Sequence, residues 1–236
     1  MPSFLIIKTP KQQIMPEEIA SKAKELSAKE SNKDYREGTL PESVRIIKDN
    51  VYFVFGFEYD FEYPTLEGTG KARALGEVPI VFLGKSFLAI GNATKEIQQR
   101  VKKFLEDNFI PEIMLEPIPF KEDILRSVIQ RNPDVFQVDH TPSRKGLETI
   151  DKISLVGRGV THSQIWEDYG DQPLEKVKVR LTDIPEEAVV GFHKKGIITI
   201  YQTSLTVEQI AIVLRELVDK VVAPLMTEVS FQRRLV

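Results

Sequence analysis

Hydrophobic and polar residues alternate with a period of two along residues 51–63, which is the pattern of a β-strand. One face of this strand is aromatic along its whole length, and the opposite face changes from apolar to acidic. The aromatic face consists of Phe53, Phe55, Phe57, Tyr59, Phe61 and Tyr63, and the acids are Glu58, Asp60 and Glu62. We expect the aromatic face to lie in the core. Base-stacking platforms interleave aromatic residues with lysine and arginine, whereas this strand carries acids. We expect the acids to keep a strand edge solvated and Pro64 to end the strand.

The rest of the chain alternates between short strands and amphipathic helices. Apolar residues at helical spacing predict helices over 16–29, 95–108, 121–131 and 207–221, with Thr94 and Thr206 as N-caps. Residues 132–151 are expected to form a polar connection, and residues 159–173 a long loop. The expected strands are 4–8, 44–48, 51–63, 71–75, 79–83, 86–91, 112–118, 152–156, 176–181, 189–192 and 197–201.

The order of these elements repeats. Residues 82–90 lie over residues 192–200 at an offset of 110, and residues 44–47 lie over 153–156 at an offset of 109. We therefore predict an α+β protein with a mostly antiparallel sheet and helices on one face. Residues 1–110 and 111–236 would be two related repeats of order β-α-β(n)-α, either as two domains or as one continuous domain. This order resembles the duplicated saddle of TATA-binding-protein-like folds, and two ferredoxin-like halves would give a similar order.

Composition narrows the possible chemistry. The 236 residues include no cysteine, which excludes disulfides, thiolate metal sites and cysteine nucleophiles. No segment approaches the roughly 20 apolar residues of a membrane span, and the N-terminus lacks the features of a signal peptide. We therefore expect a cytoplasmic protein. Acids and bases nearly balance at a net charge of −3, so a nucleic-acid site would have to be a local patch.

The motifs of cofactor enzymes are missing. Gly84-Lys85-Ser86 has the ending of a phosphate-binding loop, but Pro79 occupies the position of its first glycine and a strand is expected to follow. A hairpin turn is the better interpretation, and no cofactor is expected.

A basic strand is the leading candidate for an anion-binding site. Lys176, Lys178 and Arg180 share one face of the strand expected over residues 176–181, and Arg158 is a candidate neighbour. This face would bind phosphates, or it would complement the acidic strand across a pseudo-symmetric or dimeric interface. The alternative is a solvated face with counter-charges nearby.

The loop over residues 159–173 is the second candidate. It combines a lone tryptophan with a tyrosine, a histidine and acids: His162, Trp166, Asp168, Tyr169 and Asp171. With His140 these residues would form the site of a metal-dependent hydrolase or nuclease. The alternative is that Trp166 packs under the loop and that the histidines lie on the surface.

The sequence thus favours a non-enzymatic binding or assembly module over an enzyme. Its expected partner is anionic, either a nucleic acid or an acidic protein, and a homo-oligomer is compatible with the same pattern. The small metal-dependent hydrolase or nuclease remains the alternative.

Overall fold

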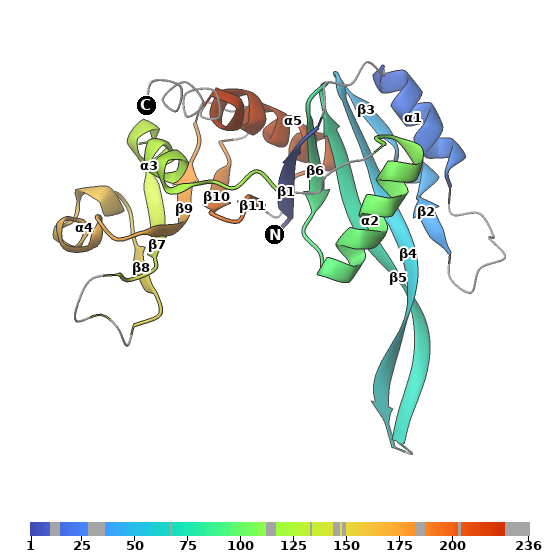
Figure 1. Cartoon of the computed structure of the whole chain (residues 1–236), viewed down its shortest axis with the longest axis horizontal. Coiled ribbons are helices and arrows are strands. Elements are labelled where there is room, and N and C mark those ends of the chain that lie inside the picture. Colours follow the sequence, from blue (N-terminus) through green and yellow to red (C-terminus); the bar gives the residue numbers. More distant parts are fainter. Residues whose placement is uncertain are drawn as a thin grey trace. The chain divides into compact units, whose positions relative to one another are not determined.

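The computed structural model divides the chain into two compact units (Figure 1). The first unit comprises Ile7–Glu116, and the second comprises Met1–Ile6 together with Pro117–Val236. Within these units, the residues that the structure describes are 1–9, 15–27, 36–66, 68–111, 117–132, 134–143, 147, 150–182, 187–202 and 204–224. The strand expected over 112–118 therefore lies almost entirely outside the described residues.

The first unit is an antiparallel sheet with two helices on one face. Its strands follow the order β2-β4-β5-β6, and β3 also pairs with β4. The helices share one core with the odd-numbered side chains of β4 and with alternate residues of β5 and β6. The elements are α1 (Pro16–Glu25), β2 (Glu37–Thr39), the 3-10 helix η1 (Pro41–Ser43), β3 (Arg45–Ile47), β4 (Asn50–Thr65), β5 (Gly68–Leu83), β6 (Phe87–Gly91) and α2 (Lys95–Asn108).

Local signals explain where these elements begin and turn. The Thr94 side chain accepts a hydrogen bond from the backbone N–H of Ile97, as expected of an N-cap. Gly84 takes a φ of 59°, the left-handed conformation that the tight turn between β5 and β6 requires. The expected hairpin at Gly84-Lys85-Ser86 is therefore confirmed.

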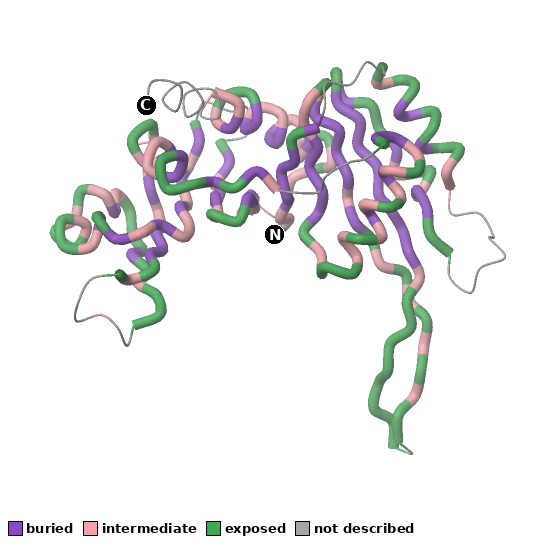
Figure 2. Tube along the Cα trace, in the orientation of Figure 1, coloured by how far each residue is buried: buried purple, intermediate pink, exposed green. Residues whose placement is uncertain are grey.

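The long strand differs from its prediction in two ways. It does not end at Pro64 but runs to Thr65, and the strands expected over 71–75 and 79–83 are one continuous strand, β5. The two strands pair along their whole length, from Asn50↔Leu83 to Thr65↔Gly68. Beyond Phe57 this hairpin leaves the body of the unit as a two-stranded arm, exposed along most of its length (Figures 1 and 2). We define the arm as residues 58–65 and 68–75.

The second unit is also an antiparallel sheet. Its strands follow the order β1-β11-β10-β9-β7-β8. The helix α3 packs on β9, and Phe120 packs edge-to-face on Phe192 of β10. The elements are β1 (Ser3–Lys8, of which residues 3–6 belong to this unit), α3 (Glu122–Arg131), β7 (Val135–His140), β8 (Ile153–Val156), the 3-10 helix η2 (Val160–His162), α4 (Gln164–Tyr169), β9 (Leu174–Arg180), β10 (Val189–His193), β11 (Ile197–Ile200), α5 (Val207–Leu217) and the π-helix η3 (Val218–Val222).

Two predictions for this unit were wrong. Residues 135–140 are not a polar connection but a strand, β7, that lies between β8 and β9. Residues 159–173 are not a continuous loop, because they contain η2 and α4. By contrast, Thr206 caps α5 as predicted and forms a capping box with Gln209.

The predicted class is confirmed: the protein is α+β, with antiparallel strands and a few helices. None of the described helices has the length and apolar character needed to cross a membrane.

Candidate functional site

The side chains of β9 alternate between the core and an open face of the second unit. Val177 and Val179 are fully buried, whereas Lys176, Lys178 and Arg180 lie on the opposite face and are half-buried. The neighbouring strand β10 places His193, Gly191 and Val189 directly opposite these three cations. The predicted cationic strand face therefore exists.

An aromatic ring lies between the two lysines of this face. The backbone N–H of Tyr201 donates to the carbonyl of Val189, which carries the ring back over β10. The ring covers Gly191, where an added Cβ would lie 3.0 Å from Cε2 of Tyr201. The Nζ atoms of Lys178 and Lys176 lie 4.1 and 5.4 Å from the ring centroid, within the range of cation–π attraction. We call Lys176, Lys178, Arg180 and Tyr201 the cationic face.

Sequence reasoning missed Tyr201, although a signal was present. The ring needs a residue without a side chain beneath it, and Gly191 is the glycine within a predicted strand that provides this space.

Arg180 extends the face with a second aromatic contact. Its guanidinium carbon lies 5.1 Å from the ring centroid of Phe136, and its Nε lies 3.7 Å from a carboxylate oxygen of Asp134. Arg158 is placed differently: it is exposed in the turn after β8, and β7 separates that strand from β9. The structure therefore brings together three of the four predicted cations.

Counter-charges neutralise only part of this surface. Lys152 pairs with the buried Asp139 at 2.7 Å, and Lys194 pairs with Glu175. Arg180 is near Asp134, so each of the three acids Asp134, Asp139 and Glu175 already has a cationic partner. Among the described residues, no acidic side chain forms an ion pair with Lys176 or Lys178. The two lysines that flank Tyr201 are thus the surplus positive charge of the face.

The histidine at the edge of this face is affected by the same charges. Burial lowers the pKa of His193, and the nearby lysines Lys195, Lys176 and Lys194 lower it further, against an opposing effect of Glu175. This shift favours the neutral form of His193, so the positive charge of the face comes from lysine and arginine.

The second predicted site is built differently from the expectation. Ser163 caps α4 by accepting from the N–H of Trp166 at 3.3 Å, and the indole then packs on the ring of His140, with centroids 5.8 Å apart. His140 is not a surface histidine: it is fully buried, and its Nδ1–H donates to the carbonyl of Gln172 at 3.0 Å. Among the described residues its Nε2 atom has no hydrogen-bond partner. Trp166 is therefore a packing anchor over a buried histidine.

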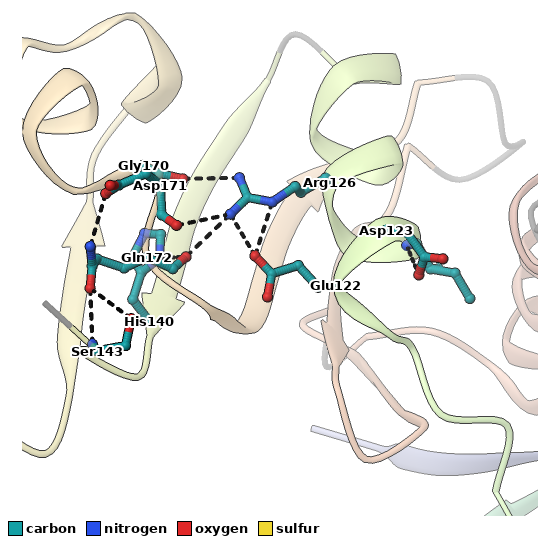
Figure 3. Close-up of polar contacts among 9 residues, drawn as sticks. Glu122, Asp123, Arg126, His140, Ser143, Gly170, Asp171 and Gln172 are labelled. Atoms are coloured by element: carbon teal, nitrogen blue, oxygen red, sulfur yellow. Dashed lines mark hydrogen bonds and ion pairs between the residues drawn. The ribbon is translucent and has the colours of Figure 1, made fainter.

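An arginine of α3 holds the segment that follows α4 (Figure 3). The guanidinium of Arg126 donates to the carbonyl of Gly170 at 3.0 Å and approaches the carbonyls of Asp171 and Gln172 at 3.4 Å, while its Nε lies 3.0 Å from Glu122. Burial and the charge of Arg126 lower the pKa of His140, against the hydrogen bond to Gln172 and the charges of Asp139 and Glu122.

The remaining residues of this candidate do not converge. His162 and Asp168 are exposed on η2 and α4, Tyr169 is half-buried, and Asp171 accepts from the side-chain amide of Gln172 at 2.9 Å. Within the described parts of the chain, no group of three or more histidine, aspartate and glutamate residues is placed to hold a metal ion. The geometry of this segment is that of a packed connection.

Comparisons with known proteins add no assignment: no protein-family model matches the chain, and no curated protein matches it in sequence.

Proposed function

We propose that the protein is a non-enzymatic binding module whose cationic face takes an anionic partner, and that single-stranded nucleic acid fits this face best. The observation that carries the proposal is the Tyr201 ring flanked by Lys176 and Lys178. Single-strand platforms combine cations for the phosphates with aromatic rings on which bases stack. The aromatic row of β4 lacks this combination, whereas the cationic face has it.

The shape of the face supports a single strand over a duplex. The three cations follow one β-strand, at successive same-face positions, and a flat sheet face accommodates an extended backbone. A base on Tyr201 would displace the lysine ammonium groups from the ring toward phosphates on either side of it. Recognition through the major groove of a duplex needs an element that enters the groove, and β9 is a central strand, paired on both sides.

The proposal includes a duplicated architecture. Both units contain a run of antiparallel strands followed by a helix, β4-β5-β6-α2 in the first and β9-β10-β11-α5 in the second. We propose that the two units are diverged copies in the manner of a TATA-binding-protein-like saddle. Superposition of these runs in a crystal structure would test the relation; a different strand order in the matched runs would contradict it.

The binding experiment uses a fluorescently labelled, mixed-sequence single strand of RNA or DNA. We expect affinity to fall as salt rises, with a slope that decreases by about 1.4 in the variant Lys176→Gln/Lys178→Gln, because each phosphate contact on a single strand contributes about 0.7. We expect Tyr201→Leu to weaken binding by about 5- to 150-fold while keeping the salt slope, since it removes the stacking ring and leaves both lysines in place.

The matched control changes the same charge elsewhere. Lys102→Gln/Lys220→Gln removes two lysines that pair with Glu106 and Glu216 on helices, and this variant should bind like the wild type. Equal loss in both double variants would reduce the effect to net charge and contradict the proposed face. Binding to polyglutamate but to neither nucleic acid would redirect the proposal to an acidic protein.

A further inference from the structure

The arm has one face without a single charged side chain. On this face the aromatic residues of β4 lie opposite the smallest residues of β5: Tyr59 pairs with Ala74, Phe61 with Ala72, and Tyr63 with Gly70. The opposite face is highly charged, and its cross-strand ion pairs include Lys71 with Glu62 at 3.3 Å and Arg73 with Asp60 at 3.2 Å. The arm is therefore an amphipathic two-stranded ribbon.

The aromatic face of the arm continues the core of the first unit beyond the helix that covers it. Phe53 and Phe55 pack against Phe104 of α2, and Arg100 of the same helix lies over the ring of Phe57 at 4.8 Å. The row of rings then continues with centroids 5.9–6.3 Å apart through Tyr59, Phe61 and Tyr63. Each of these three residues is 42% exposed, whereas Phe57 is 4% exposed.

The rings cover the small residues that lie opposite them. The ring of Tyr63 lies across the backbone of Gly70, where an added Cβ would lie 2.7 Å from Cζ. The face therefore presents ring surfaces and short side chains, with no charge to exclude another apolar surface. A two-stranded ribbon is marginally stable by itself in water, and burying its apolar face would stabilise it.

We propose that this aromatic face is an interface between two copies of the chain. The bulky side chains lie on one strand and the small side chains on the other. A two-fold axis running along the arm places the aromatic strand of each copy over the small-residue strand of the other, so that one face complements itself. The charged faces of both arms then remain in water.

Charge argues against nucleic acid as the occupant. The arm carries three acids (Glu58, Asp60 and Glu62) and two bases (Lys71 and Arg73), for a net charge of −1, and the turn that joins its strands adds the acid Glu67 in the sequence. Such an arm repels a polyanion. Two arms repel each other only weakly through their outward faces, and salt screens this repulsion.

The buried area predicts a weak, reversible dimer. At 42% exposure each of the three rings offers roughly 60–100 Å² to a partner, so six rings contribute about 400–600 Å². This is less than the roughly 1,000 Å² that a stable interface buries, so the association we expect is transient. Association should therefore depend on protein concentration.

The test is sedimentation velocity of the full chain from about 1 to about 300 µM. We expect a monomer–dimer equilibrium that the variant Phe61→Ser/Tyr63→Ser shifts at least tenfold toward monomer. Leu75→Ser is the matched control, because Leu75 is 53% exposed on the opposite face of the same arm. This control should dimerise like the wild type.

A second measurement locates the contact. Since the chain contains no cysteine, Ala72→Cys introduces a unique thiol on the aromatic face and Thr69→Cys one on the opposite face. A short bismaleimide should link two copies through position 72 and not through position 69. A monomer over the whole concentration range, or a dimer that Phe61→Ser/Tyr63→Ser leaves intact, would overturn the proposal. A monomer that instead floats with phospholipid vesicles would also overturn it.

Discussion

At the scale of single residues, His140 makes the stability of the second unit depend on pH. Its folded pKa is lowered from an ordinary value of 6.5, first because burial penalises the imidazolium. The unfolded chain therefore binds a proton more readily than the folded chain, so stability is complete above about pH 6.5 and falls as the pH drops through this value toward the folded pKa. Urea unfolding at pH 7.5, 6.5 and 5.5 should show a falling midpoint.

His193 contributes in the same direction, so the comparison must isolate His140. His140→Leu removes the titration while leaving His193 unchanged, and the loss of the hydrogen bond to Gln172 lowers stability at every pH. The midpoint of this variant should vary less between pH 7.5 and 5.5 than that of the wild type. Equal pH dependence in both proteins would show that His140 titrates alike in the folded and unfolded states.

The same histidine shows where prediction from sequence stops. Residues 135–140 lie between Pro133 and Pro142, and their alternation of apolar residues is irregular. The structure explains the irregularity: the register of β7 against β9 shifts between Val135 and Gln137 and again between Asp139 and His140. A bulged strand does not keep a period of two, so the pattern favoured a connection. The clean alternation of β9, by contrast, predicted the three cations of the face correctly.

At the scale of elements, the sequence predicted the β4 strand but not where the core along it ends. Alternation is the same for Phe57 and Phe61, because both positions face one side of a pleated strand. What differs is the cover supplied by α2, a tertiary contact that periodicity does not encode. The prediction that Pro64 ends the strand was wrong for a related reason. Pro64 pairs with Thr69 near the tip of the arm, and an edge position tolerates a residue without an N–H.

This end of the core can be measured with two substitutions on β5. Gly76→Val should destabilise the protein by about 1–3 kcal/mol, because its Cβ would lie only 2.3 Å from Cζ of the buried Phe57. Ala72→Val adds comparable bulk opposite the exposed Phe61 and should change stability by less than about 0.5 kcal/mol. The free energy of unfolding in urea is the measurement. A larger loss for Ala72→Val would place the end of the core farther along the arm.

At the scale of the whole molecule, the two proposed surfaces lie in different units and respond differently to salt. Lys176 and Lys178 release counterions from a bound strand, so added salt weakens nucleic-acid binding. Dimerisation brings together two arms of net charge −1, so added salt leaves the dimer unchanged or strengthens it. We therefore expect Lys176→Gln/Lys178→Gln to lose nucleic-acid binding and keep the dimer. We expect Phe61→Ser/Tyr63→Ser to lose the dimer and keep the intrinsic affinity of each protomer for nucleic acid. Binding and sedimentation measured on both variants at 50 and at 300 mM salt separate these effects, because the Debye length differs about 2.4-fold between the two concentrations. Loss of both properties in either variant would contradict two separate surfaces. It would mean that the acidic arm of one copy contacts the cationic face of a second copy.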